Sequence, residues 1–171
     1  MKSLSAVGNP LSKANYQKQV LRKDMPSIPQ FHTKLQEVGS LPLLTTDVEI
    51  LQVNLGKMCN QVCAHCHVDA GPDRKEIMTK EMMEACLIAV EASPSIHTVD
   101  MTGGAPEMNP NFQWFVEELS KLGRKTIVRS NLTILMANKK YNKHPEFLSL
   151  IHISEPTRPL YISYAVFCLK K

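Results

Sequence analysis

The chain has 171 residues, of which 43% are hydrophobic and 21% are charged, the composition of a soluble globular protein with one ordinary core. The formal net charge of +4 is small and the Lys and Arg residues are scattered, so we expect no nucleic-acid partner. The N-terminus lacks the apolar core of a secretory signal, and the five cysteines are odd in number and unevenly spaced. We therefore expect a cytoplasmic protein without a membrane partner, whose cysteines serve metal or redox chemistry rather than disulfides.

Residues 1–44 are polar and are interrupted by four prolines and by Gly39. Because proline and glycine break regular structure, this composition predicts an irregular or briefly helical N-terminal extension that wraps over the core. Regular apolar patterns begin only after this stretch, and residues 45–147 are predicted to form the folded domain.

Residues 45–147 predict three strands that alternate with two helices. The first strand lies in DVEILQVNLG, ends at Gly56 and has apolar residues on both faces, as in a strand covered on both sides. Leu51, Val53 and Leu55 lie on one face, and Val48 and Ile50 on the other. The other strands are IHTVDM and KTIVRS. This order implies right-handed crossovers and a parallel sheet, so the predicted fold class is α/β.

The two predicted helices join these strands in turn. TKEMMEACLIAVEAS predicts a helix with Thr79 as its N-cap. Its expected apolar face comprises Met82, Ala85, Cys86, Ala89 and Val90. On such a face Cys86 is expected to be a small buried hydrophobe. NPNFQWFVEELSKLG predicts a helix capped by Asn109, with Pro110 as its first residue and Gly123 at its end.

Each unusual motif follows the end of a predicted strand. CNQVCAHC follows the first strand, TGGAPE the second and SNLT the third. The carboxyl ends of parallel strands meet at one edge of a sheet, and ligands of α/β sheets and barrels bind there. We therefore expect one site built from all three motifs.

The cysteine motif has the spacing C-x3-C-x2-C, formed by Cys59, Cys63 and Cys66. Three thiolates without a nearby fourth match neither a disulfide framework nor a closed structural zinc site. His65 or His67 would complete a zinc site, and CAHC would serve as a thioredoxin-like redox pair. The third interpretation is an iron–sulfur cluster with three irons held by the protein and one iron left open.

This cysteine spacing after a first strand, with a glycine pair after the second, resembles the radical S-adenosylmethionine (SAM) superfamily. The resemblance implies an enzyme in which Cys59, Cys63 and Cys66 bind a [4Fe–4S] cluster and the open iron is chelated by SAM. One electron from a donor such as a flavodoxin or ferredoxin then cleaves SAM to methionine and a 5′-deoxyadenosyl radical, which acts on a small-molecule substrate. The implied fold is a partial (β/α)6 barrel, and residues 45–147 correspond to its first half.

The same resemblance implies SAM contacts at the strand ends. Gly103 and Gly104 let the backbone approach a ligand closely, and Glu107 adds a carboxylate near the SAM ammonium group. Ser130 and Asn131 match the polar groups of the third-strand motif. The full set of expected SAM-binding residues is His65, Gly103, Gly104, Ala105, Pro106, Glu107, Ser130 and Asn131.

Two positions depart from the superfamily pattern. His65 stands where most members have an aromatic residue before the third cysteine, although a histidine ring can also stack on adenine. Leu132 replaces the usual glycine after Asn131. The neighbouring Arg129 is either a carboxylate partner or an exposed charge at the rim.

Three longer strings, CNQVCAHCHVDAGPDR, TVDMTGGAPEMNP and IVRSNLTIL, resemble the arsenosugar-biosynthesis radical SAM proteins, which carry a Cys-rich C-terminal domain. The resemblance covers Leu51 to Leu135. It implies a transferase that moves the 5′-deoxyadenosyl group of SAM to a trivalent methylated arsenical. The alternatives are another radical SAM activity, such as peptide modification, and a zinc-binding interaction module.

The sequence pattern of residues 148–171 differs from that of the rest of the chain, and reads LSLIHISEPTRPLYISYAVFCLKK. They resemble the translation of a transposase adapter and flow-cell primer used in short-read sequencing libraries, and the alternative is a genuine strand in LYISYAVFCL. On the adapter interpretation Cys168 has no chemical role and the authentic chain ends near position 147. A half barrel exposes sheet edges and apolar faces, so we expect the 171-residue product to be inactive.

Overall fold

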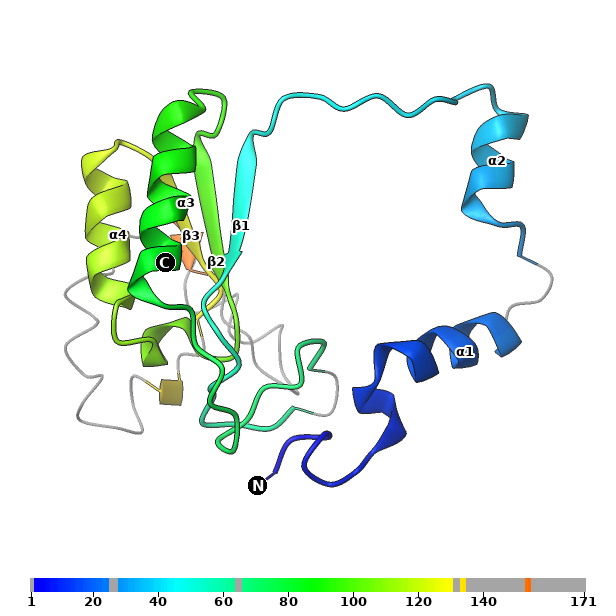
Figure 1. Cartoon of the computed structure of the whole chain (residues 1–171), viewed down its shortest axis with the longest axis horizontal. Helices are drawn as coiled ribbons and strands as arrows, with labels where there is room; N and C mark the ends of the chain where they lie inside the picture. Colours follow the sequence, from blue (N-terminus) through cyan, green and yellow to red (C-terminus); the bar gives the residue numbers. More distant parts are fainter. Residues whose placement is uncertain (1, 25–27, 64–65, 131–132, 135–152, 155–171) are drawn as a thin grey trace, which may run out of the picture. The chain divides into compact units, whose positions relative to one another are not determined.

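The computed structural model describes residues 2–24, 28–63, 66–130, 133–134 and 153–154. They belong to two units, of which one comprises Leu4–Asp47 and the other comprises Met1–Ser3 with Val48–Lys171 (Figure 1). Among the described residues, no helix is both long and apolar enough to cross a membrane.

The first unit contains a short 3-10 helix, η1 (Pro10–Ser12), and two α-helices, α1 (Ala14–Asp24) and α2 (Phe31–Glu37). The side chain of Asn9 caps η1, because its Oδ1 accepts the Leu11 main-chain N–H at 2.9 Å. None of the described side chains of these helices is buried. Within its described part, this unit therefore has no apolar core of its own.

The second unit is built on a parallel sheet. Its strands, in sheet order, are β1 (Ile50–Asn54), β2 (Thr98–Thr102), β3 (Lys125–Val128) and β4 (Ile153–Ser154). The connecting helices are α3 (Lys80–Ala92), between β1 and β2, and the short η2 (Pro106–Met108) followed by α4 (Phe112–Lys121), between β2 and β3 (Figure 1). Every strand pairing is parallel, so the predicted α/β fold class is confirmed.

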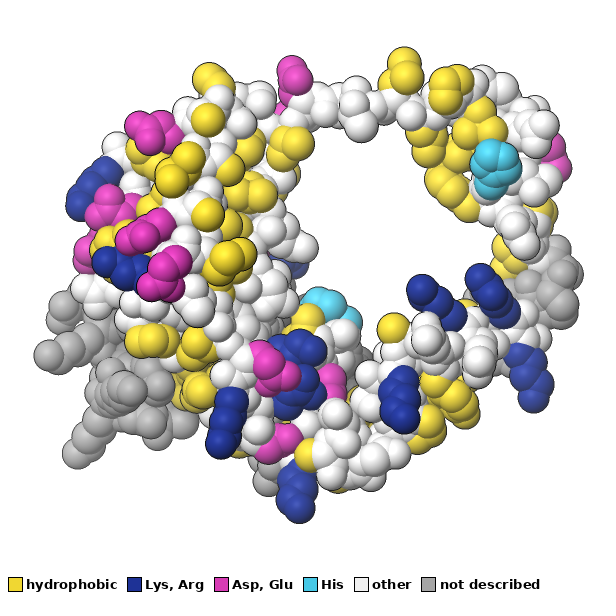
Figure 2. Space-filling view, in the orientation of Figure 1, with side chains coloured by type: hydrophobic (Ala, Val, Ile, Leu, Met, Phe, Trp, Pro, Cys, Tyr) yellow, Lys and Arg dark blue, Asp and Glu magenta, His cyan; other side chains and the backbone are white. Residues whose placement is uncertain are grey.

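One face of the sheet packs against α3 and α4 around an apolar core. The buried members of this core are Val53, Leu55, Met83, Val90, Ile96, Val99, Met101, Phe112, Phe115, Val116, Leu119 and Val128. Because side chains alternate along a strand, Gln52 of β1 and Asp100 of β2 lie on the opposite face. In a β/α barrel the face opposite the helices is the interior. In Figure 2 the described charged side chains along α1 are basic, whereas acidic and basic side chains both occur over α3 and α4.

Two predictions about burial are wrong. Met82 is 56% exposed, while Met83 is fully buried, because α3 turns Met83 and Val90 toward the sheet. Ala85 and Ala89 of the predicted face are exposed with Met82. Ile50 of β1, on the sheet face opposite the helices, is 54% exposed.

The start of α4 also differs from the prediction. Its N-cap is Asn111, two residues after the expected cap. Asn109 is instead buried, and its Nδ2 donates to the carbonyl oxygens of Leu55 and Met78 at 3.0 Å each. Through Nδ2, Asn109 ties the chain after β2 to the two ends of the loop after β1, while its Oδ1 accepts the Asn111 main-chain N–H at 2.9 Å, as a capping side chain does.

Candidate functional site

The loop that follows β1 doubles back on itself and carries the three cysteines. Its two arms are joined by main-chain hydrogen bonds from Lys57 N–H to Glu76 O at 2.9 Å, from Gly71 N–H to Lys57 O at 3.1 Å and from Cys59 N–H to Gly71 O at 3.2 Å. The second arm therefore fixes the backbone of Cys59 just beyond the end of β1.

The glycine pair after β2 packs directly against the first arm of this loop. Gly104 N–H donates to Gly56 O and Ala105 N–H donates to Met58 O, both at 2.9 Å. A Cβ atom on Gly104 would lie 2.4 Å from Met58 O, and one on Gly103, whose φ is +149°, would lie 2.8 Å from Gly56 O. The missing side chains thus make room for protein backbone, a role that the sequence did not indicate.

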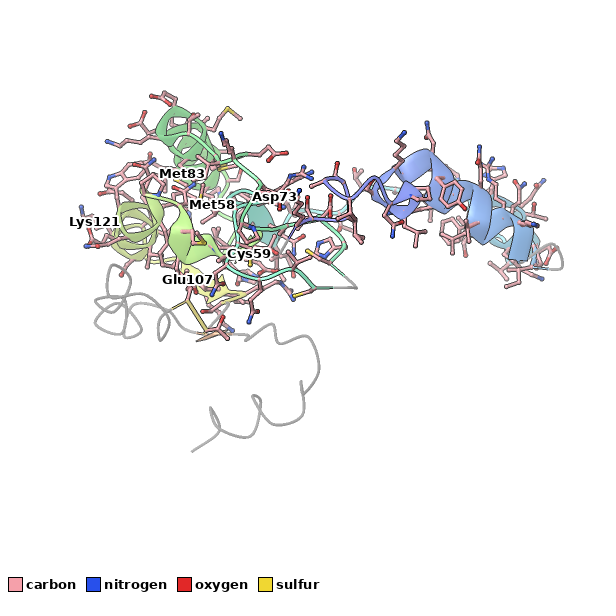
Figure 3. All side chains as sticks on the ribbon, turned by 90° about the horizontal axis from the view of Figure 1, so that it is seen from below. Met58, Cys59, Asp73, Met83, Glu107 and Lys121 are labelled. Atoms are coloured by element: carbon pink, nitrogen blue, oxygen red, sulfur yellow. The ribbon has the colours of Figure 1, made fainter. Side chains whose placement is uncertain are left out.

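The three cysteines line one cavity of about 180 Å³ at the carboxyl edge of the sheet. The other walls include Thr102, Gly103 and Gly104 at the end of β2 and Arg129 after β3. Residues from all three strand ends therefore surround one space, although Ser130 and Thr133, the described residues of the third motif, are not among them. Cys59 and Glu107, labelled in Figure 3, lie on the chain segments that follow β1 and β2.

Burial and mutual repulsion disfavour free thiolates in this cavity. Cys59 is buried, and Cys63 and Cys66 are half-buried. The pKa of the Cys63 thiol is raised, first by burial and then by the neighbouring Cys66 and Cys59. A bound cationic metal group would relieve both effects by neutralising the thiolates.

The arrangement of the thiols is compatible with a multi-iron cluster. In a tetrahedral zinc site the ligand sulfurs lie about 3.8 Å apart, as Zn–S bonds of about 2.3 Å require. Among the described residues, no three His, Cys, Asp or Glu side chains converge on a point where they could hold one metal ion. In a [4Fe–4S] cluster each thiolate binds a different iron, so three cysteines that line one cavity are compatible with it.

Sequence reasoning missed the role of Asp100, which is buried in the middle of β2 on the face away from the helices. Arg129 donates to its carboxylate from Nε at 3.1 and 3.2 Å and from Nη2 at 2.9 Å, and Gln52 Nε2 donates at 2.9 Å. Of the two alternatives for Arg129, the structure therefore selects the carboxylate partner. A charged residue between the apolar Val99 and Met101 of a predicted strand was the available signal.

Glu107 and Ser130 come together but bond to each other. Both are buried, and the Ser130 hydroxyl donates to Glu107 Oε1. Neither is among the residues that line the cysteine cavity. Ala105 is buried in a small apolar cluster with Cys59, and Pro106 is buried in η2. His65 and Asn131 lie outside the described residues.

Comparison with known families identifies the superfamily. The model of the radical SAM superfamily matches residues 53–154, which include the cysteine motif, the glycine pair and β3. The chain belongs to the radical SAM superfamily. Members of this superfamily are enzymes that bind a [4Fe–4S] cluster and SAM, so the predicted cofactors are confirmed at the level of the family.

Two curated relatives illustrate how far the similarity extends. A probable GTP 3′,8-cyclase of Sulfurisphaera tokodaii is 25% identical over 108 residues, which are 63% of this chain and 34% of that protein. The GTP 3′,8-cyclase of Heliobacterium modesticaldum is 33% identical over 79 residues, which are 44% of this chain and 24% of that protein. The chain thus spans about a third or less of the length of these relatives. Neither relative supports the prediction of arsenosugar chemistry.

Proposed function

We propose that Cys59, Cys63 and Cys66 each ligate one iron of a [4Fe–4S] cluster, and that the whole protein cleaves SAM reductively. The observation that carries this proposal is the cavity that these three cysteines share with the glycine pair. When bound, the cluster supplies the electron that breaks a carbon–sulfur bond of SAM and releases the 5′-deoxyadenosyl radical. We place this activity in the cytoplasm, with a flavodoxin or ferredoxin as electron donor.

The protein's own residues would bind and orient SAM. The chain after β2 brings Gly103 and Gly104 to the cavity wall, where their backbone is open to the amino group of SAM. We propose that Glu107 and Ser130 stabilise this segment through their buried hydrogen bond and contact SAM when it binds. His65, Ala105, Pro106 and Asn131 complete the proposed SAM-binding set.

The test compares single Cys→Ala variants of the complete protein after anaerobic reconstitution. Substitution of Cys59, Cys63 or Cys66 should abolish the broad brown absorbance and the formation of 5′-deoxyadenosine. Cys86→Ala is the matched control, because Cys86 is a half-buried thiol on α3 that is not among the residues lining the cavity. Colourless wild-type protein that binds one zinc ion per chain would favour the zinc-module alternative.

For the substrate, we propose a trivalent methylated arsenical that accepts the 5′-deoxyadenosyl group. The extended similarity of CNQVCAHCHVDAGPDR and TVDMTGGAPEMNP to the arsenosugar-biosynthesis group supports it. The charge of the site also supports a substrate without a polyphosphate. Of the described residues that line the cavity, Arg129 is the single Lys or Arg, and Asp100 already neutralises it.

A GTP-cyclase type of reaction is the second candidate, because the relatives described above are GTP 3′,8-cyclases. Incubating the reconstituted complete protein with SAM, a reductant and either a trivalent dimethylarsenical or GTP separates the two. Mass spectrometry should detect a product that contains both arsenic and the deoxyadenosyl group. A cyclised product from GTP, with no arsenic adduct, would favour the second candidate.

We also propose that residues 148–171 derive from adapter DNA, with residues 45–147 as the first half of the barrel domain and residues 1–44 as its extension. β4 lies within this tail, and its two described residues pair with β3 through Ile127 with Ile153 and Val128 with Ser154. A two-residue pairing is compatible with an unrelated extended segment that adds to the available edge of β3.

A further inference from the structure

One cysteine sulfur accepts a main-chain hydrogen bond that would affect the reduction potential of the proposed cluster. The main-chain N–H of Ala70 donates to Cys66 Sγ at 3.3 Å. Ala70 is buried beside Cys59 and Ala105, so water does not compete readily for this N–H. Hydrogen bonds to ligand sulfurs disperse the negative charge of a reduced cluster and make its reduction potential less negative.

The residue before Ala70 sets the direction of this N–H. Asp69 has a φ of +52°, in the left-handed region that residues other than glycine rarely adopt. Its own N–H donates to Cys66 O at 3.1 Å, so the chain makes a tight turn around Cys66. The conformation of Asp69 orients the following peptide group, and in this turn the group faces Cys66 Sγ.

Arg74 holds Asp69 in this conformation. Its Nη1 donates to Asp69 Oδ2 at 2.9 Å, and the two side chains are only 15% and 14% exposed. On its other side Arg74 donates to both carboxylate oxygens of Glu76, from Nε at 3.1 Å and from Nη2 at 2.5 Å. These bonds lower the pKa of Glu76 to about 2, so the carboxylate stays charged at neutral pH and keeps the guanidinium in place.

We propose that Asp69 and Arg74 are positioning residues that aim the Ala70 N–H at Cys66 and thereby raise the reduction potential of the cluster. This inference rests on the proposed ligation of a cluster by Cys66. It assigns a role to the segment VDAGPDR, which neither the cysteine spacing nor the glycine motif explains.

The decisive pair of variants is Asp69→Ala and Asp69→Gly in the complete, reconstituted protein. Both remove the same carboxylate, which by charge alone would make the potential less negative. They differ in backbone preference, because glycine adopts a positive φ freely and alanine does not. Redox titration followed by electron paramagnetic resonance should therefore give a more negative potential for Asp69→Ala than for wild type, and no such decrease for Asp69→Gly.

A second measurement is independent of the cluster. In the cluster-free protein, Arg74→Gln should speed hydrogen exchange at the Ala70 amide by about tenfold, because the left-handed turn loses its support. Lys75→Gln is the matched control, since it removes an adjacent, exposed positive charge and should leave exchange unchanged.

The outcomes separate this inference from the proposed function. Wild-type protein that takes up no cluster would overturn both. A cluster in the wild type, with equal potentials in Asp69→Ala and Asp69→Gly, would overturn the positioning role alone. If Asp69→Ala takes up no cluster, unchanged exchange at Ala70 in Arg74→Gln would overturn the positioning role instead.

Discussion

Replacement of Gly104 by alanine should dislocate the loop that carries the cysteines. The added Cβ would lie 2.4 Å from Met58 O, 2.9 Å from Met58 C and 3.0 Å from Lys57 C. All three are main-chain atoms, so no side-chain rotation relieves the clash, and the loop must move away. That movement would break the hydrogen bonds from Gly104 to Gly56 and from Ala105 to Met58.

The expected cost follows from these contacts. Two hydrogen bonds contribute about 1 kcal/mol each, and overpacking adds about 1–3 kcal/mol, so the free energy of unfolding should fall by about 3–5 kcal/mol. Gly123→Ala is the control, because no atom lies within 4 Å of its added Cβ, and its cost comes from a positive φ of +66°, which Gly104 does not have. Its cost should be limited to the conformational penalty, about 1–2 kcal/mol.

Urea denaturation of the complete protein, with iron content after reconstitution as a second readout, measures both effects. With an m-value of about 2 kcal/mol/M, Gly104→Ala should lower the midpoint by roughly 2 M and reduce iron retention. Gly123→Ala should lower the midpoint by less than about 1 M and keep its iron. Equal midpoints and equal iron content in the two variants would refute the idea that this glycine is required for backbone contact.

Three further predictions concern charge and chain origin. Asp100→Asn should lower the free energy of unfolding in urea titrations by about 1–3 kcal/mol. This loss is smaller than for a fully buried ion pair, because the Arg129 side chain is 39% exposed. An unchanged urea midpoint would contradict this prediction. Hydrogen bonds from Arg74 lower the pKa of Glu76 to about 2 from 4.5, so Glu76 stabilises the fold above about pH 4.5 and this stability is lost as the pH falls toward 2. Because the Glu76 side chain is 54% exposed, the free energies of unfolding of wild type and Glu76→Gln should differ by less than about 1 kcal/mol. This difference should disappear at pH 2, and a difference that persists there would be inconsistent with the lowered pKa. Sequencing the source DNA across codon 147 should show a coding sequence that departs from residues 148–171, and an uninterrupted gene encoding LSLIHISEPTR would exclude the adapter origin.

Local signals in the sequence predicted most of the fold. Apolar periodicity alone was enough to predict the order of strands and helices. Thr79 and Gly123 also marked helix ends that the structure confirms. Thr79 Oγ1 accepts the Met82 N–H at 3.4 Å, and Gly123 has a φ of +66°. The choice between Met82 and Met83 was not predictable in this way. Both faces of α3 offer apolar residues, and only packing against the sheet decides which face is buried.

The contacts that build the site depend on the register between strands and on residues that are distant in sequence. Local sequence patterns do not predict either. Asp100 pairs with Gln52 because the register places these residues opposite each other on β1 and β2. Asn109 resembled a helix cap because its sequence neighbours suit a helix start. Its Oδ1 accepts the Asn111 N–H at 2.9 Å, and its Nδ2 in addition donates to the carbonyl oxygens of Leu55 and Met78, which are distant in sequence.

The same register explains why the motifs after β1 and β2 form one site. Asn54 is paired with Thr102, so the two chains leave the sheet at the same level. Two residues later the Gly104 N–H donates to Gly56 O at 2.9 Å. A side chain on Gly104 would clash with the nearby Met58 backbone and so prevent this contact. The glycine pair therefore fixes the distance between the cysteine loop and the end of β2. A cavity that holds three thiols beside open backbone follows from that distance, and any substitution that widens it should reduce cluster retention even when every cysteine is present.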